Sequence, residues 1–287
     1  MKILVTGSNG QLGHEMKNVL EGKMPGMTLY TDIEELDLTD CKAVEKYVID
    51  NDITHIVNCA AYTNVDKAEE EKLLCASINV NAVKNLAMAA DQNGAKIIHV
   101  STDYVFDGKS YKPYSESDKV NPISQYGTTK RQGETSLLAL APDSIIIRTA
   151  WLYSPYGKNF VKTMLELGAA RKELRVVCDQ IGTPTYALDL AEAIYVILSS
   201  HQWIPGIYHF TDEGACSWYD FTKAIMRISG IKGCKVYPIP SEDYPTAAAR
   251  PYYSVLNRSR IKMTYDIEIP HWEESLQDCI KRLKTGY

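Results

Sequence analysis

Residues 3–13 read ILVTGSNGQLG, an apolar run followed at once by three glycines spaced three residues apart. A strand, a glycine turn and a helix in this order are typical of a dinucleotide-binding unit, because the pyrophosphate meets unpaired N–H groups at the helix N-terminus. Gly7 would permit the tight turn, Gly10 a close approach of the phosphates, and Gly13 close packing of helix against sheet. The spacing differs from the G-x-G-x-x-G of many dehydrogenases, but its position after the first strand predicts a dinucleotide site.

Asp32 lies about twenty residues past the glycines, where an acid commonly holds the adenosine ribose diol. A solvated loop carboxylate is the alternative. Residues 33–35 (IEE) offer no Arg or Lys for a 2′-phosphate. The sequence therefore leans towards NADH, while NADPH stays open because a basic residue can come from elsewhere. Other predicted cofactor contacts lie in the turn and after neighbouring strands: Asn9, Gln11, Leu12, Asp37, Leu38, Ala60, Ala61 and Tyr62.

Short β-rich runs alternate with longer segments of helical period. The expected strands are residues 3–6, 28–31, 55–59, 97–101, 145–148 and 175–178, and the expected helices are 11–20, 40–49, 73–92, 125–140 and 160–171. Asp40 is a plausible N-cap of the second helix. Several strands are apolar on consecutive residues, as in parallel strands covered on both faces. This order predicts right-handed βαβ units and an α/β fold with a Rossmann-type, doubly wound parallel sheet.

The regular alternation fades after about Trp151. Residues 237–253 are rich in Pro and Tyr and are expected to form a loop, followed by a last helix around residues 272–284. We therefore predict an NAD(P)-binding domain of residues 1–150, joined by roughly 175–200. Residues 151–174 and 201–287 are predicted to form a smaller, mainly C-terminal α/β substrate-binding lobe.

Composition excludes several classes of protein. The chain has 287 residues, of which 45% are hydrophobic and 23% charged, as is ordinary for a globular protein. A net charge of -5 and a pI near 5.7 argue against a nucleic-acid binder. No apolar run is expected to reach the roughly 18–20 residues of a membrane span. Seven scattered cysteines without a C-x-x-C pattern suit a reducing cytoplasm rather than disulfides or zinc.

The pattern Tyr-x-x-x-Lys occurs twice, at Tyr126/Lys130 and at Tyr219/Lys223. Residues four apart share one helix face, so the ammonium can lower the pKa of the phenol towards a range useful for acid–base catalysis. Only the first copy has a partner, because Thr102 ends a predicted central strand, and ligands bind at such strand ends. Its hydroxyl can bind the carbonyl oxygen that Tyr126 would protonate. We predict that Thr102, Tyr126 and Lys130 catalyse hydride transfer with a nicotinamide cofactor.

The second copy lies on an expected amphipathic helix with no strand end beside it. We predict that Tyr219 packs there and that Lys223 is solvated.

The glycine turn, residues 101–103 (STD) and residues 126–130 (YGTTK) resemble the extended short-chain dehydrogenase/reductase superfamily. More narrowly, the chain resembles the dTDP-4-dehydrorhamnose reductase family over nearly its whole length. The matching stretches are residues 63–69 (TNVDKAE), 101–108 (STDYVFDG), 148–151 (RTAW), 159–164 (NFVKTM), 179–185 (DQIGTPT), and parts of 244–257.

The resemblance implies reduction of the C4 carbonyl of dTDP-4-dehydro-β-L-rhamnose to dTDP-L-rhamnose, with NADPH or NADH as hydride donor. It implies that Arg250 faces the nucleotide diphosphate, which suits the bidentate geometry of a guanidinium. Arg250 as a surface residue and Trp151 as core packing are the alternatives. Beside the catalytic Thr102, Tyr126 and Lys130, the sugar pocket would be lined by Thr63, Val65, Thr102, Asp103, Tyr104 and Trp151.

Three rival functions and one metal site are the alternatives to this interpretation. In dehydratases of the superfamily a Glu follows the Thr-Asp pair, whereas Tyr104 stands here, which favours reduction over water elimination. A non-catalytic NADP-binding subunit, resembling the regulatory subunit of methionine adenosyltransferase, and a reductase of another 4-keto nucleotide sugar stay open. Some family members dimerise through magnesium held by glutamates. Glu15 matches one such position, but Leu188 stands at the second, so we predict no metal and a monomer or homodimer.

Overall fold

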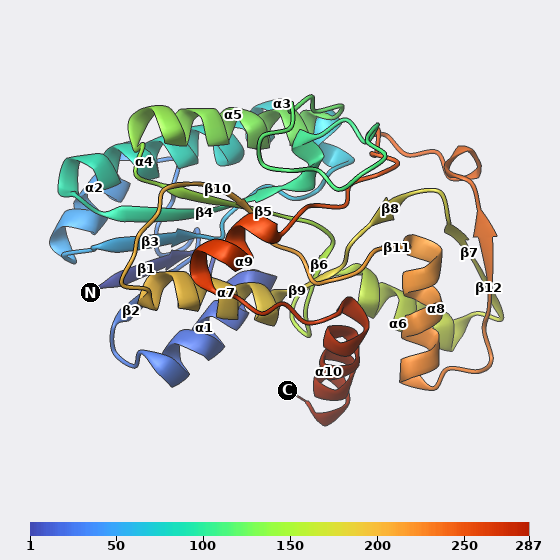
Figure 1. Cartoon of the computed structure of the whole chain (residues 1–287). Coiled ribbons are helices and arrows are strands. Elements are labelled where there is room, and N and C mark those ends of the chain that lie inside the picture. Colours follow the sequence, from blue (N-terminus) through green and yellow to red (C-terminus); the bar gives the residue numbers. More distant parts are fainter. Residues whose placement is uncertain (287) are drawn as a thin grey trace.

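A six-stranded parallel sheet forms the centre of the computed structural model, which describes residues 1–286 (Figure 1). The strands follow the order β10-β5-β4-β3-β1-β2. They are β1 (Ile3–Thr6), β2 (Thr28–Thr31), β3 (His55–Asn58), β4 (Lys96–Thr102), β5 (Ile145–Thr149) and β10 (Gly206–His209). The strand order reverses between β1 and β3, with β2 on one side of β1 and β3, β4, β5 and β10 on the other, as in doubly wound folds. The Rossmann-type sheet predicted from the sequence is therefore confirmed.

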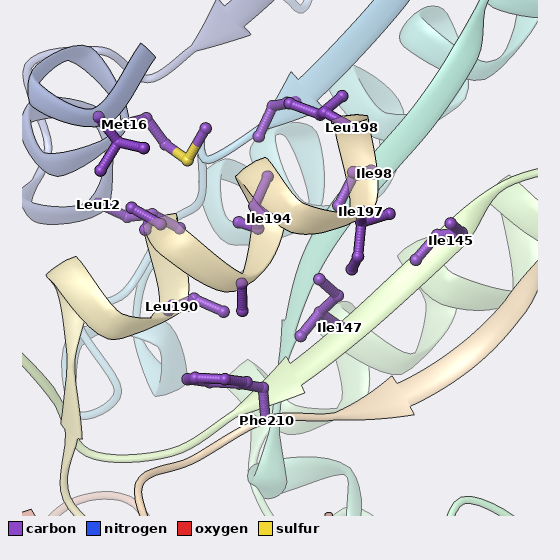
Figure 2. Packing of buried hydrophobic residues seen from close by; sticks show 14 of the residues in the cluster. Leu12, Met16, Ile98, Ile145, Ile147, Leu190, Ile194, Ile197, Leu198 and Phe210 are labelled. Atoms are coloured by element: carbon purple, nitrogen blue, oxygen red, sulfur yellow. The ribbon is translucent and has the colours of Figure 1, made fainter. Parts of the chain in front are cut away.

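Helices cover both faces of this sheet. One face packs against α1 (Gln11–Lys23), α7 (Ala187–Ser199) and α9 (Ser259–Tyr265), and the other against α2 (Cys41–Asp50), α4 (Ala82–Asn93) and α5 (Gln125–Leu140). On β5, Ile145 and Ile147 point into the first layer, where Figure 2 shows them beside Ile194 and Ile197 of α7, while Ile146 joins the second layer. Burial on both faces explains why the strands are apolar on consecutive residues.

A second hydrophobic cluster lies beyond one end of the sheet (Figure 1). It is formed by α6 (Phe160–Ala170), α8 (Trp218–Ser229), α10 (Trp272–Thr285) and the pair β7 (Glu173–Val177) and β12 (Lys235–Ile239). Two further two-stranded pairs connect this cluster to the sheet, β6 (Leu152–Tyr153) with β9 (Thr185–Tyr186), and β8 (Ile181–Gly182) with β11 (Cys216–Ser217).

Several expectations about single elements are corrected by the pairing. The strand expected at residues 175–178 is β7, but it pairs with β12 and not with the central sheet. Residues 237–239 accordingly belong to β12 rather than to the expected loop. Strand β10 lies in the segment predicted as substrate lobe, yet it pairs with β5. The division into two lobes stays a prediction.

Helix boundaries agree better with the sequence. Helix α5 has the bounds expected for it, and the Asp40 carboxylate caps α2 by accepting from the N–H groups of Lys42 and Ala43. Within residues 1–286 one helix, Lys72–Asn93, is long and apolar enough by length and composition to cross a membrane, contrary to expectation. It consists of α3 (Lys72–Ala76), a π turn at Ser77–Asn81 (η2) and α4. Half of its apolar window is buried, and core helices of globular proteins pass the same test.

Candidate active site

The glycine turn after β1 cannot accommodate side chains at two of its positions. Gly7 has a φ of +65°, and a Cβ there would lie 2.7 Å from the Cα atom of Ala60. A Cβ on Gly13 would lie 2.3 Å from the carbonyl oxygen of Gly7. The turn is fixed from outside, because the N–H of Asn9 donates to the Asp32 carboxylate at 2.9 Å. Helix α1 begins after Gly10 without a side-chain cap, so its first N–H groups suit an anion site.

A cleft of about 440 Å³ opens at the carboxyl ends of β1, β2 and β3. The hydroxyl oxygen of Thr31, one of its lining residues, is buried and has no hydrogen-bond partner. The cleft thus combines a glycine cradle, a carboxylate and apolar walls, which fits the adenosine half of a dinucleotide. Its predicted lining residues are Gly7, Asn9, Gly10, Asp32, Asp37, Leu38, Ala60 and Ala61, and those not predicted include Thr6, Thr31, Ile33, Leu36, Thr39, Cys59, Ile78 and Ala82.

Four other predicted cofactor residues do not line this cleft. Leu12 is buried in the core between sheet and helices, and Gly13 packs against the turn. The Gln11 side chain accepts from the Asn159 amide at 2.9 Å, which ties the turn to the N-terminus of α6. The Tyr62 phenol donates to Glu71 at 2.5 Å. Contact of these four with a cofactor stays a prediction, and for Leu12 it would involve its backbone.

Tyr126 and Lys130 lie on the buried face of α5, and Thr102 ends β4 beside them. The close approach of α5 to Tyr104 depends on Gly127, because a Cβ there would lie 2.2 Å from the carbonyl oxygen of Tyr104. The ring of Tyr104 meets that of Tyr126 edge-on, with centroids 5.5 Å apart. The structure therefore brings together the three groups that the sequence predicts as catalytic, at the strand end where the prediction placed them.

The pKa values of this group differ from the expectation. Burial raises the pKa of the Tyr126 phenol above its ordinary value, and the Thr102 hydroxyl opposes the shift. The predicted lowering by Lys130 is thus wrong, because desolvation dominates. Burial also lowers the pKa of Lys130 to about 8, and its amine donates to the Val100 carbonyl at 2.7 Å. Tyr126 consequently stays protonated at neutral pH, which is the state a proton donor needs.

Asp103 is buried beside the Thr102 hydroxyl. One carboxylate oxygen accepts from the Thr102 hydroxyl at 3.0 Å, and the other oxygen has no partner. Burial raises the pKa of Asp103 to about 6, with hydrogen bonds from Ser254 and Thr102 acting against it. An unpartnered oxygen at this depth favours binding of a polar group such as a sugar hydroxyl.

Arg250 is held by a carboxylate. Its two terminal nitrogens pair with the Asp66 oxygens at 3.1 and 2.7 Å, and its side chain is 22% exposed. Asp66 belongs to the same stretch as Thr63 and Val65, so Arg250 lies beside two other predicted substrate residues. This placement disfavours the alternative of an isolated surface residue, while contact with a diphosphate stays a prediction.

Trp151 combines backbone strain with close packing. Its φ is +47°, in the left-handed region that costs a non-glycine residue about 1–2 kcal/mol. Its indole stacks on that of Trp218 with centroids 3.4 Å apart, and Gly182 leaves room for the ring. The structure thus shows the packing alternative for one face of the ring. A role in the sugar pocket stays a prediction, and strain of this kind often occurs at functional sites.

A buried ion pair near the site was not foreseen from the sequence. Glu134, one turn after Lys130 on α5, binds Arg148 of β5 through two contacts of 2.8 and 2.7 Å. It also accepts from the Ser101 hydroxyl at 2.6 Å. The pair therefore joins α5 and β4, which carry the predicted catalytic residues, to β5. Its only signal in the sequence is the spacing of four between Lys130 and Glu134, which places both on one helix face.

Asn79, in the π turn, is a second residue that sequence reasoning missed. Its side chain accepts from the Tyr62 N–H at 2.9 Å and donates to the Tyr62 carbonyl at 3.2 Å. It also donates to the Thr129 hydroxyl at 3.2 Å, next to Lys130. The π turn thus connects the wall of the cleft to α5, and such turns are frequent at functional sites.

Two remaining predictions concern residues away from this site. Tyr219 and Lys223 lie on α8, in the outer cluster, and Lys223 is exposed. Glu15 is buried and pairs with Arg282 at 2.8 Å. The described residues, 1–286, contain no group of three metal-ligating side chains. That no metal binds stays a prediction.

Comparison with known proteins identifies the family. The family model for the RmlD substrate binding domain matches residues 1–285. A dTDP-4-dehydrorhamnose reductase of Aggregatibacter actinomycetemcomitans is 41% identical over 286 residues, covering 96% of this chain and 97% of that protein. A solved dTDP-4-dehydrorhamnose reductase of Clostridium acetobutylicum has a TM-score of 0.95 and 47% identity, covering 99% of this chain and 100% of that one.

The dTDP-4-dehydrorhamnose reductase of Bacillus anthracis, solved in complex with NADP, has a TM-score of 0.94 and 39% identity, covering 98% of this chain and 100% of that one. These matches extend over both the sheet and the outer cluster. The chain therefore belongs to the dTDP-4-dehydrorhamnose reductase family and is an NAD(P)H-dependent oxidoreductase.

Proposed function

We propose that this enzyme reduces the C4 carbonyl of dTDP-4-dehydro-β-L-rhamnose and so forms dTDP-L-rhamnose. The observation that carries the proposal is the buried group of Thr102, Tyr126 and Lys130 at the end of β4, in a chain of this family. A nicotinamide dinucleotide, NADPH or NADH, held by the glycine turn and the cleft residues, supplies the hydride. Another 4-keto nucleotide sugar is the alternative substrate, because the residues proposed to bind substrate address its sugar and diphosphate and not its base.

In the proposed reaction the Tyr126 phenol donates its proton to the carbonyl oxygen as negative charge develops there. Because burial raises the pKa of Tyr126, the phenol carries this proton before the reaction begins. The Thr102 hydroxyl, now donating to Asp103, turns to the same oxygen and orients the carbonyl. Lys130, anchored on the Val100 carbonyl, holds the cofactor ribose. Fixed positions for all three groups lower the entropy cost of reaching the transition state.

The nucleotide sugar is proposed to bind between the cofactor cleft and the outer cluster. Thr63, Val65, Tyr104 and Trp151 would contact the sugar, and Arg250 would contact the diphosphate by exchanging part of its pairing with Asp66. Residues 1–150 with roughly 175–200 would bind the cofactor, and the rest would form the substrate lobe. The acidic pI supports an enzyme that does not act on nucleic acid, and seven scattered cysteines without a C-x-x-C pattern support a reducing cytoplasm. We propose a monomer or homodimer and no membrane partner.

The direct test mixes purified protein with enzymatically generated dTDP-4-dehydrorhamnose and follows oxidation of NADH and NADPH in parallel. Formation of dTDP-rhamnose with either cofactor would establish the reaction. If thermal shift shows cofactor binding but no oxidation follows, the substrate is a different 4-keto sugar or the chain is a non-catalytic binder. Pull-down of a stoichiometric partner protein would then favour the binder.

Asp32 provides a prediction about cofactor choice. Its carboxylate lines the cleft and would repel a 2′-phosphate while binding a ribose diol. Replacing Asp32 with Asn keeps an acceptor for the Asn9 N–H and removes the charge. We expect the ratio of kcat/KM for NADPH over NADH to rise about fivefold or more, since a close like-charge contact costs at least about 1 kcal/mol. Steady-state kinetics with both cofactors measures this ratio.

The matched control is Glu34→Gln, which removes an exposed charge two residues away that does not line the cleft. This control should leave the ratio unchanged. An equal ratio in wild type and Asp32→Asn would show that Asp32 does not face the ribose.

A further inference from the structure

A line of buried polar side chains runs beneath Lys130 and crosses three strands of the sheet. The Asn58 carbonyl oxygen accepts from the Ala60 N–H at 3.1 Å and from the Thr6 hydroxyl at 2.8 Å. The Asn58 amide nitrogen lies 3.0 Å from Nδ1 of His99, and Nε2 of His99 lies 3.5 Å from Nζ of Lys130. His99 is 0% exposed and Lys130 is 2% exposed, so water does not replace these contacts.

The direction of each hydrogen bond in this line is determined by its backbone end. A backbone N–H only donates, so the Asn58 atom beside Ala60 must be the carbonyl oxygen. The other Asn58 atom, facing His99, is then the NH2 group, which only donates. Nδ1 of His99 must therefore accept, and a neutral imidazole that accepts at Nδ1 carries its proton on Nε2. His99 is neutral, because burial and, secondly, the charge of Lys130 lower its pKa well below the ordinary value.

This tautomer points an N–H group at Lys130. An ammonium has three donors and no acceptor, so it faces the Nε2–H of His99 unfavourably. An uncharged amine has a lone pair to receive that N–H and still donates to the Val100 carbonyl at 2.7 Å. The 3.5 Å separation is long for a hydrogen bond. The effect therefore comes mainly from the orientation of the ring dipole.

We propose that His99 is a positioning residue that favours the uncharged amine of Lys130, through a tautomer fixed by Asn58 and the Ala60 N–H. The tautomer of His99 follows from these contacts alone, whereas its role in catalysis rests on the proposed reduction. After Tyr126 gives its proton to the product, the phenolate must regain one. Proton transfer from the Lys130 ammonium restores the phenol and leaves the amine, which takes a proton from water. By favouring the amine, His99 makes this ammonium a readier proton donor.

Burial and three other side chains also shift the pKa of Lys130. Burial has the largest effect and lowers its pKa to about 8, while Glu134 on α5 raises it. The Glu134 carboxylate is engaged by Arg148. The thiols of Cys75 on α3 and Cys59 after β3 act in the same direction as Glu134. Burial raises the pKa of Cys59 to about 12, so that thiol carries no charge at neutral pH. Among these groups, only His99 presents a fixed donor towards Nζ.

The first test reads the tautomer directly and needs no substrate. Long-range ¹H–¹⁵N NMR of the ¹⁵N-labelled wild-type protein distinguishes a protonated from a bare imidazole nitrogen. We expect His99 to carry its proton on Nε2 throughout pH 6–9. His209 is the internal reference, because it is also buried and its Nδ1 faces the Tyr114 carbonyl at 3.1 Å, which requires the opposite tautomer. His209→Gln and His99→Gln each remove one signal and so assign the two residues. A proton on Nδ1 of His99 would overturn the proposal.

The second test reads the ionisation of Lys130 and uses two substitutions. His99→Met removes the N–H that faces Nζ, and His99→Gln keeps both an acceptor for Asn58 and an N–H for Lys130. In ¹³C-lysine-labelled protein, NMR follows the titration of Lys130 with pH. We expect the titration midpoint to rise by about one pH unit in His99→Met and to be unchanged in His99→Gln. The alkaline limb of kcat should move likewise. An unmoved midpoint in a folded His99→Met protein would overturn the proposal.

The NMR experiments also separate this inference from the proposed function. If the expected tautomer and midpoint shift are found but dTDP-4-dehydrorhamnose is not reduced, the inference holds and the substrate assignment fails. If reduction is observed but His99 has the other tautomer, the function holds and the inference fails.

Discussion

Replacing Tyr126 with Phe is expected to lower kcat by about 10²–10⁴-fold, the range typical for loss of a positioned general acid. The phenylalanine ring keeps the edge-on contact with Tyr104, so the fold and the cofactor cleft should be unchanged. Only the phenolic proton is lost, and Thr102 cannot replace it because a hydroxyl of ordinary acidity is a poorer proton donor. Steady-state kinetics with dTDP-4-dehydrorhamnose, together with cofactor binding by thermal shift, measures both quantities.

The chain offers a matched control for this substitution. Tyr219 occupies the same position in the second Tyr-x-x-x-Lys pattern, on α8 in the outer cluster. Tyr219→Phe removes the same atom and should leave kcat at the wild-type level. Turnover near wild type in Tyr126→Phe would instead remove Tyr126 from the mechanism.

Replacing Glu134 with Ala is expected to lower the free energy of unfolding by about 3–5 kcal/mol, because it leaves a buried guanidinium without a counter-charge. The Arg148 side chain is only 1% exposed, and the Glu134 side chain is 0% exposed. One nitrogen of Arg148 already has no hydrogen-bond partner, so its remaining contacts with Glu134 are the more important. Denaturant unfolding followed by circular dichroism measures the loss.

The control for this prediction is an ion pair on the surface. Arg227 and Glu273 pair between α8 and α10 with side chains 65% and 41% exposed, so Glu273→Ala should cost no more than about 1 kcal/mol. The double variant Glu134→Ala/Arg148→Met should be more stable than Glu134→Ala alone, since it removes the stranded charge. Equal losses for the two Glu→Ala variants would contradict the argument.

The same ion pair is expected to make the free energy of unfolding depend on pH. Burial raises the pKa of Glu134, but the hydrogen bonds and charge of Arg148 outweigh it and hold the pKa below the ordinary value. Because the pKa of Glu134 is lower in the folded than in the unfolded state, the ion pair stabilises the fold fully above the unfolded-state pKa, about 4.3. This stabilisation is lost as the pH falls through the folded-state pKa. The difference in stability between wild type and Glu134→Ala should therefore narrow in acid.

Local patterns predicted the elements that carry the site. The apolar run before Gly7 and the four-residue spacing of Tyr126 and Lys130 are properties of neighbouring residues, and the structure has β1 and α5 with the expected bounds. Strand β10 was missed because Gly206–His209 is short and begins with glycine, and only its pairing with β5 makes it a strand.

Relations between distant residues could not be read in this way. The contact of Glu134 with Arg148, and that of Asn58 with His99, depends on which strands lie side by side. The direction of the Tyr126 pKa was wrong because the spacing of a motif says nothing about desolvation. Burial is a property of the whole fold and was therefore the least predictable quantity at the site.

The order of the strands also determines how the protein can be made on the ribosome. The chain leaves the central sheet at the end of β5 and returns only with β10, after α6, β7 and α7 have been synthesised. Until α7 has emerged, Ile145 and Ile147 of β5 lack the helix that covers them, and until Gly206–His209 has followed, β5 remains an open edge. Such an edge readily pairs with other chains. The nascent chain is therefore expected to need protection from such pairing until β10 has joined β5.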